Sequence, residues 1–210
     1  MLDIFFLDKR TYRGDNTANT EEGGAPFLGT AQLEWVKQGL AASNATWKII
    51  ASDMPIGMMV RDGDAAFENG ANGDGPVLGR EVDIADLLRF IKHASVENTV
   101  WLTADVHYTA AHHYSPDRAQ FQDFNPFWEF VSGPLHAGTF GPSDYDNTFG
   151  PEVRFAKHPE EGQRNLPPSD GLQFFGKVDI DASAQVMTVR LMDSADIELW
   201  SVDLEPASLA

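Results

Sequence analysis

Three short apolar segments alternate with two amphipathic ones in the first half of the chain, and this order restricts the fold more than any other feature. Residues 4–7, 47–51 and 98–103 are apolar and rich in β-branched or aromatic side chains, as in buried strands. Between them, apolar residues recur at helical spacing over residues 30–42 and 83–93. Strand, helix, strand, helix, strand is the pattern of a mainly parallel sheet flanked by helices. The sequence therefore predicts an α/β fold.

The second half has a different pattern. Residues 127–131 form another short apolar segment, which predicts a further strand. Near the C-terminus, apolar and polar residues alternate over residues 172–180, 186–192 and 197–204, as in antiparallel strands, and residues 181–184 are a plausible hairpin turn. We expect a single domain over residues 1–205, followed by a short tail over residues 206–210.

Two long segments rich in glycine and polar residues interrupt these elements. Residues 57–80 and 133–171 are predicted to be irregular, and long loops in compact domains are usually functional or disordered. The Gly- and Pro-containing stretch over residues 133–142 would let backbone N–H groups approach an anion, with His136 as a candidate site residue. A tight structural loop is the alternative there.

Composition and charge limit the function. A hydrophobic content of 42% fits a globular protein, and the absence of cysteine excludes thiol catalysis and Cys-rich zinc sites. The formal net charge of −17 argues against nucleic acid as a partner, because such a surface repels the phosphate backbone. A bound metal ion reverses the charge locally, so an acidic protein that acts on phosphate esters is expected to use metals.

Membrane insertion and export signals are not apparent in the sequence. No apolar run approaches the roughly 18–20 residues that a transmembrane helix needs. The first six residues lack the basic flank and the small-residue cleavage site of a signal peptide.

The most informative ionisable residues are Asp105 and His107, which directly follow the predicted strand over residues 98–103. Ligands of such sheets bind beyond the carboxyl ends of the strands. In an extended chain, residues two apart point the same way, so we expect the Asp105 carboxylate and the His107 imidazole to converge on one metal ion. The alternative is a polar strand end with a hydrogen-bonded histidine.

Asp8 and Arg10 form a second ionisable cluster, at the end of the first predicted strand. The planar guanidinium of an arginine grips a phosphate through two hydrogen bonds. Arg10 and Asp8 are therefore candidate substrate-binding residues. The alternative is an Asp–Arg pair that fastens a loop.

Several segments, in order along nearly the whole chain, resemble the PhoD-like alkaline phosphatase family. The strand followed by Asp8-Lys9-Arg10-Thr11-Tyr12-Arg13 is similar to the family's strand-Asp-x-Arg-x-Tyr-Arg segment, and residues 98–107 resemble its Asn-x-Val-x-Leu-Thr-Gly-Asp-Val-His motif. Residues 28–35 with 45–48, 129–134 and 171–176 are similar to further segments of the family. One departure is Ala104, which stands where the family commonly has glycine.

This resemblance implies a fold, an activity and cofactors. It implies a metallophosphoesterase-type core of two facing β-sheets with helices outside, of which this chain is the C-terminal half, ending in antiparallel strands. The activity implied is hydrolysis of phosphate mono- and diesters by a metal-activated hydroxide, with iron and calcium as cofactors. Carried over, His107 and Asp105 are metal ligands, Arg10 and His107 are catalytic, and Asp8 and Arg10 contact the substrate. A periplasmic or secreted location is implied by the family alone.

The segments that carry most of the family's metal ligands have no counterpart in residues 1–210. We therefore expect a fragment of a metallophosphatase, whose partner is its N-terminal half. The first alternative is a catalytically incomplete scaffold or partner-binding domain. The second is an acidic calcium-binding module that uses residues 57–80. An unpaired sheet edge also predicts self-association.

Overall fold

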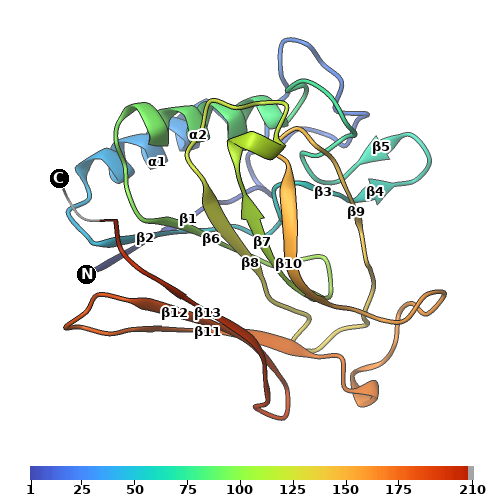
Figure 1. The fold of residues 1–210 in the computed structure, drawn as a ribbon. Helices are drawn as coiled ribbons and strands as arrows, with labels where there is room; N and C mark the ends of the chain where they lie inside the picture. The colour runs from blue at the N-terminus through green and yellow to red at the C-terminus, as the bar shows by residue number, and fades with distance from the viewer. Residues whose placement is uncertain (208–210) are drawn as a thin grey trace.

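The computed structural model describes residues 1–207, which form three layers: two helices, a six-stranded sheet and a three-stranded sheet (Figure 1). The predicted tail over residues 206–210 lies partly outside the described residues. The helices are α1 (Thr30–Ala42) and α2 (Glu81–His93). Neither helix among the described residues has the length and apolar content of a membrane span.

The large sheet has the strand order β1-β2-β6-β8-β7-β10. Its first four strands are parallel, whereas β7 and β10 run antiparallel to their neighbours. The bounds of its strands are β1 (Leu2–Phe6), β2 (Trp47–Ala51), β6 (Thr99–Thr103), β8 (Phe127–Val131), β7 (Thr109–Tyr114) and β10 (Pro151–Lys157).

The second sheet is the antiparallel meander expected at the C-terminus. It consists of β11 (Phe174–Ile180), β12 (Met187–Asp193) and β13 (Glu198–Leu204). Short pairs complete the fold: β3 (Met58–Met59) with β9 (Asp144–Tyr145), and β4 (Arg61–Asp62) with β5 (Ala66–Phe67). Two single 3-10 turns lie at Pro116–Arg118 and Pro168–Asp170.

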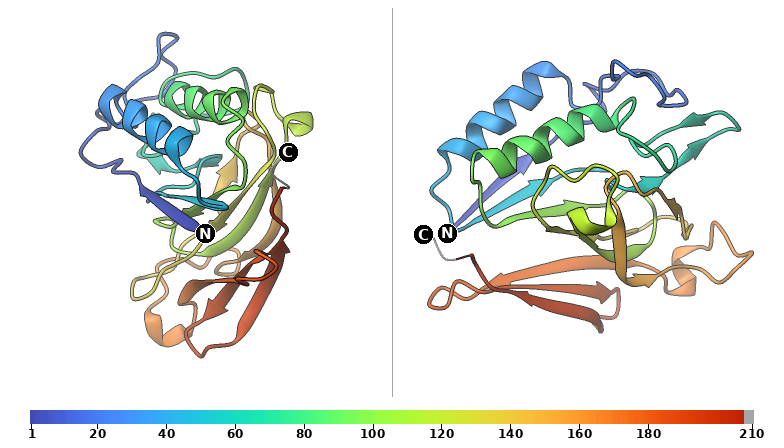
Figure 2. Two further views of the ribbon diagram at one scale, coloured as in Figure 1. Left: turned by 90° about the vertical axis from the view of Figure 1, so that its left-hand side faces the viewer. Right: turned by 45° about the horizontal axis from the view of Figure 1, so that its top comes forward.

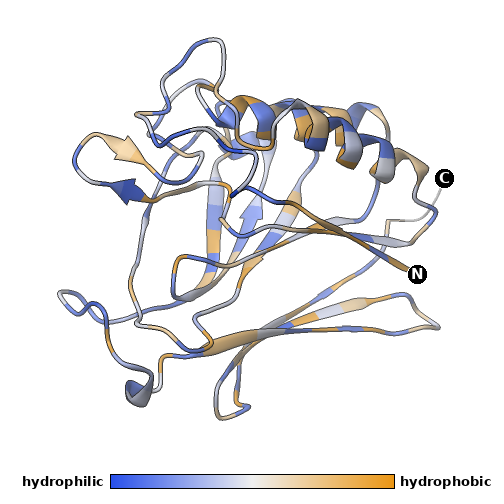
Figure 3. Cartoon of the chain, turned by 180° about the vertical axis from the view of Figure 1, so that it is seen from behind, coloured by the Kyte–Doolittle hydropathy of each residue, from blue (hydrophilic) through white to orange (hydrophobic). Residues whose placement is uncertain are grey.

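Alternation along the parallel strands explains why both faces of the large sheet are covered. Ile50 and Trp101 lie in the cluster beneath the helices, whereas their neighbours Ile49 and Val100 pack against the second sheet. Successive side chains of a strand point to opposite faces, so each of these strands is apolar on both. Figure 2 shows the sheet between the two covering layers, and Figure 3 shows that the covering helices carry both hydrophilic and hydrophobic residues.

These observations confirm the predicted α/β fold with flanking helices and C-terminal antiparallel strands. Two strands of the large sheet, β7 and β10, were not predicted, and neither were the two-residue strands β3, β4, β5 and β9. Strand β10 was assigned to an irregular segment because of its Gly- and Pro-rich surroundings, but Pro151 is the first residue of an edge strand, where a missing N–H is tolerated. Strand β7 was not predicted because its adjacent histidines interrupt the apolar pattern, although the fold buries His112 completely.

Leu191 tests the packing between the two sheets. Its side chain is fully buried against residues of the large sheet. We expect Leu191→Ala to lower the free energy of unfolding by about 2–5 kcal/mol, because a cavity replaces the lost side chain. Urea denaturation measures this value. Ile197→Ala is the control, since that side chain is 57% exposed and its loss should change stability by less than about 0.5 kcal/mol.

Candidate active site

The segments that follow three parallel strands meet at one end of the large sheet. Residues 8–13 follow β1, Asp53 follows β2 by two residues, and Asp105 follows β6 by two residues. Ladder-like backbone bonds hold these segments side by side: Leu7 N–H donates to Ala51 O, and Ala104 N–H donates to Asp53 O. The topology thus brings ionisable side chains to the carboxyl edge, where ligands bind in such sheets.

Arg10 lies at the centre of three carboxylates from three other segments. Its guanidinium is 3.8 Å from Asp53 Oδ2, 3.1 Å from Glu68 Oε1 and 3.5 Å from Asp105 Oδ1. The Arg10 side chain is 58% exposed, whereas each carboxylate partner is less than a third exposed. The guanidinium is therefore partly open to solvent, and the three less exposed carboxylates fix its orientation.

Asp8 acts on the backbone of the same turn and forms no ion pair with Arg10. One Asp8 oxygen accepts the N–H groups of Arg10 and Thr11, at 2.9 and 2.8 Å. Hydrogen bonds with Thr11 are the main cause of a lowered pKa of the Asp8 carboxyl group. Asp8 thereby fixes the turn from which the Arg10 side chain projects.

Asp105 and His107 occupy a tight turn, because β6 ends at Thr103. Both residues have left-handed backbone conformations, with φ of 66° and 62°, and Val106 N–H donates to Ala104 O within this turn. The expectation of an extended backbone at these two residues was therefore wrong. Left-handed non-glycine residues are uncommon and are enriched at functional sites.

The two residues nevertheless line one pocket. A cavity of about 280 Å³ is lined by Glu68, Asp105 and His107 together with Phe140 and Arg164. Burial, followed by the nearby Glu68 carboxylate, raises the pKa of Asp105, while Arg10 opposes this shift. The His107 ring donates from Nδ1 to the Gly138 carbonyl at 2.6 Å, which leaves Nε2 with its lone pair as a ligand or proton acceptor.

The Gly-rich loop contributes through its backbone. Gly138 supplies the carbonyl that orients His107, and Phe140 packs edge-on against the imidazole at 5.4 Å between ring centroids. His136, a candidate from the sequence, is exposed elsewhere on the loop and does not line this cavity.

The donor types at this edge suit a metal, but their number falls short. Carboxylate oxygens bind hard cations, and an imidazole nitrogen suits iron. No group of three or more His, Asp or Glu side chains within residues 1–207 is arranged to hold a metal ion. Asp105 and His107 would provide at most part of a coordination shell.

Two residues of the site were not predicted from the sequence. Asp53 follows a buried strand in the same way as Asp105, so its signal was present in the sequence. Glu68 gave no such signal, because it lies in a long loop after β5 and reaches the site only through the fold.

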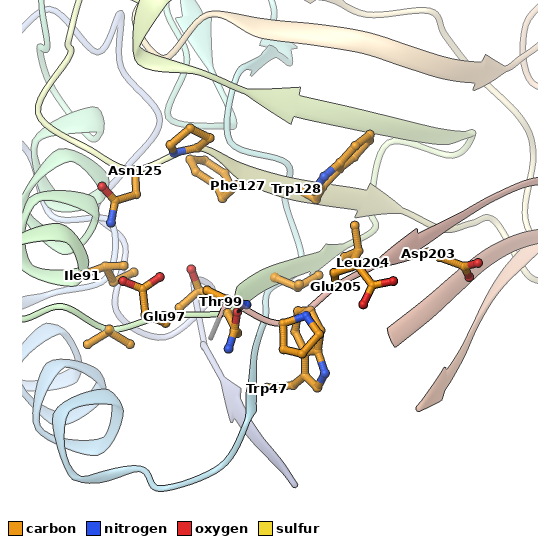
Figure 4. A pocket seen from close by; sticks show the side chains of 16 residues that line it. Trp47, Ile91, Glu97, Thr99, Asn125, Phe127, Trp128, Asp203, Leu204 and Glu205 are labelled. Carbon is orange, nitrogen blue, oxygen red and sulfur yellow. Dashed lines mark hydrogen bonds between the residues drawn. The ribbon is translucent and has the colours of Figure 1, made fainter. Parts of the chain in front are cut away.

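A second cavity does not belong to this site. It measures about 380 Å³ and lies at the opposite end of the strands, where Trp47, Thr99 and Phe127 begin β2, β6 and β8 (Figure 4). Asp203 and Leu204 of β13 line its other side. It contains none of the ionisable cluster at the carboxyl ends of the strands.

A mixed sheet covered by helices, with acidic and basic side chains gathered at the carboxyl ends of its strands, is the arrangement of α/β enzymes that bind ligands at this edge. The sequence model of the PhoD-like phosphatase family matches residues 1–191. The chain therefore belongs to the PhoD-like phosphatase family, as the resemblance predicted.

Structural comparison agrees with this assignment. The chain is similar to a solved structure described as "Structure of PhoD", with a TM-score of 0.54 and 15% sequence identity. The match covers 98% of this chain and 39% of that chain, so residues 1–210 span about two fifths of the PhoD structure. At this identity the likeness shows the fold. No curated protein matched the sequence significantly.

Lys9, next to Arg10 in sequence, gives a test of the electrostatics beneath the site. Its ammonium is fully buried and donates to Met54 O at 2.8 Å. Burial lowers the pKa of Lys9 from 10.5 to about 8, against the opposing effect of Asp53. Between these two pH values the folded state binds fewer protons than the unfolded state, so the Lys9 contribution to stability rises with pH.

From pH 7.5 to pH 10, we expect the free energy of unfolding of the wild type to increase by roughly 2–3 kcal/mol relative to that of Lys9→Met. Urea denaturation of both proteins at the two pH values measures this difference. Lys177→Met, which removes a half-exposed ammonium, should follow the wild type. Parallel pH profiles for the wild type and Lys9→Met would contradict the assignment of a buried, charged Lys9.

Proposed function

We propose that this chain supplies the phosphate-binding face of a PhoD-like phosphatase that hydrolyses phosphate mono- and diesters. The observation that carries the proposal is Arg10, a planar guanidinium that three carboxylates orient and that is 58% exposed at the carboxyl edge of the sheet. Such a group binds two phosphate oxygens at once. Residues 1–205 would act as one domain, the C-terminal part of the catalytic domain.

The remaining site residues have complementary roles in this proposal. Asp8 acts on substrate binding through Arg10, since it holds the backbone turn at Arg10 and Thr11. His107 presents Nε2 towards the pocket because Gly138 O fixes its other nitrogen. Asp105, with its raised pKa, lies between Arg10 and the His107 pocket.

Asp105 and His107 would be two ligands of a metal that, when bound, polarises the phosphoryl group and lowers the pKa of an attacking water. Iron and calcium are proposed from the family alone, and so is a periplasmic or secreted location. The other ligands would come from outside residues 1–207.

A second candidate function is a partner-binding domain without activity, and one observation favours it. The three-stranded sheet packs against residues of β2, β6, β7, β8 and β10, and this cluster contains no residue of β1. On the uncovered face of β1, Leu2, Ile4 and Phe6 are 38%, 45% and 72% exposed. Strand β1 is also an edge of its sheet. A second copy of the chain would cover this apolar face by packing the same face of its own β1 against it around a twofold axis.

Replacing Arg10 tests the first function. The chain is assayed with a chromogenic phosphate monoester and diester in the presence of iron and calcium, alone and with the separately supplied N-terminal half of a PhoD-like phosphatase. We expect Arg10→Gln to lower kcat/KM by about 10- to 100-fold, the worth of a charged hydrogen bond to phosphate, and Arg10→Lys to restore only part of it. Arg89→Gln, at an exposed ion pair with Asp123, is the control. Absence of turnover under both conditions would refute the proposed function.

Phe6→Lys tests the second candidate. Sedimentation velocity of the wild type at rising concentration should show association, because burial of the apolar face of β1 is favourable. A charge at Phe6 should keep the chain monomeric, whereas Leu135→Lys, at a side chain of the same 72% exposure elsewhere, should not. A wild type that stays monomeric throughout would count against self-association.

A further inference from the structure

Two buried carboxyl groups meet at the start of α2, from segments far apart in the sequence. Glu81 is the first residue of α2, and Asp146 directly follows β9 (Figure 1). They are only 1% and 3% exposed. The two carboxyl groups lie within hydrogen-bonding reach of each other. Neither residue lines the pocket of the candidate active site.

Each carboxyl group has one oxygen bound by donors and one oxygen without any partner. Asp146 Oδ2 accepts the N–H groups of Asn72 and Gly73, at 3.0 and 3.4 Å. Glu81 Oε2 accepts Leu78 N–H at 3.2 Å and the Asn72 side-chain amide at 3.4 Å. Glu81 Oε1 and Asp146 Oδ1 are buried and have no hydrogen-bond partner. A buried oxygen left in this state is unfavourable and requires an explanation.

No positive charge offsets this pair. None of the Lys, Arg and His side chains in the described part of the chain forms an ion pair with Glu81 or Asp146. Arg80 is adjacent in sequence, but its guanidinium donates to the carbonyl groups of Glu68, Gly14 and Asp15. Burial and the neighbouring Asp146 raise the pKa of Glu81 to about 9, and burial raises that of Asp146.

Neutral oxygen atoms surround the same point. The Thr148 hydroxyl is buried beside the Glu81 carboxyl group. It lies 3.3 Å from the Gly75 carbonyl and also within hydrogen-bonding reach of the Glu81 carboxyl group, and the Thr148 backbone N–H reaches Asp146. Two carboxylates with hydroxyl, carbonyl and water oxygens form the all-oxygen ligand set that calcium accepts in irregular geometries.

We propose that Glu81 and Asp146 bind one hard divalent cation through their two unpartnered oxygens, with Ca²⁺ as the best-fitting ion. A single shared proton would also bridge these oxygens, but it would leave a net negative charge in the interior. The N–H donors on the other two oxygens lower the pKa of each group and so oppose the effect of burial, and a divalent cation would neutralise both carboxylates. The bound ion would connect α2, the segment over residues 72–78 and the segment over residues 146–148.

Calcium-dependent stability tests this site. Thermal unfolding is followed at pH 8 with a chelator and with increasing Ca²⁺. We expect the melting temperature to rise by roughly 5–10 °C at a Ca²⁺ concentration about 100 times the Kd. Glu81→Gln and Asp146→Asn should each weaken the apparent affinity at least tenfold. Asp64→Asn, an exposed acid in the loop over residues 57–80, should respond as the wild type does.

Two further measurements keep this test decisive. His107→Ala should retain the full calcium response, which separates this site from the candidate active site and from the proposed phosphatase function. Hydrogen exchange of the wild type, which needs no variant, should slow on Ca²⁺ addition at residues 72–82 and 144–150. An absent calcium response, or one that survives in both Glu81→Gln and Asp146→Asn, would overturn the proposal. Variants that are more stable than the wild type and insensitive to Ca²⁺ would instead show a shared proton and would overturn it too.

Discussion

The buried carboxylate of Glu129 holds together the elements on which the candidate site rests. It lies in the middle of β8 and is completely buried. Glu129 Oε1 accepts Ile56 N–H at 2.8 Å, and Oε2 accepts the His112 ring and the Tyr114 hydroxyl at 2.9 and 2.8 Å. One side chain thus joins β8 to β7 and to the segment after β2. Removing one partner of such a network typically lowers the free energy of unfolding by about 3–5 kcal/mol, because the remaining buried groups lose their hydrogen bonds.

Lys9 binds the same segment at a second point. Its ammonium donates to Met54 O, and it interacts favourably with both Asp53 and Glu129. The backbone between Asp53 and Ile56 is therefore held by one buried positive and one buried negative group. Asp53, whose own carboxylate accepts Met54 N–H, stands at the start of this segment. A rigid layer of this kind allows Arg10 to remain more than half exposed and still be oriented, which is what recognition of a ligand from solution requires.

The sequence predicted the elements whose periodicity reflects burial, and it failed where tertiary contacts decide. Helix α1 and strands β2 and β8 have the expected bounds, because their apolar spacing follows from facing a core. Strand β7 was not predicted because histidines are polar and suggest an exposed segment. In the structure His112 is buried, and its two ring nitrogens form hydrogen bonds with Glu129 and Tyr145. The left-handed backbone at Asp105 and His107 could not be predicted, because neither residue is a glycine, which usually marks this conformation in a sequence. Glu68 joins the site only through contacts across the fold.

The two acidic clusters solve the same electrostatic problem differently. At the carboxyl edge, Arg10 interacts with three partly exposed carboxylates, and solvent screens the remaining charge. At the start of α2, Glu81 and Asp146 lie out of reach of solvent and have no basic partner within residues 1–207. Screening falls away on burial, so the second pair needs either a bound proton or the bound cation that we propose. In a chain of net charge −17, basic side chains are scarce, and a cation from solution is the remaining counter-charge. Stability and substrate binding would then depend on different positive charges, one supplied by the solvent and one by the protein.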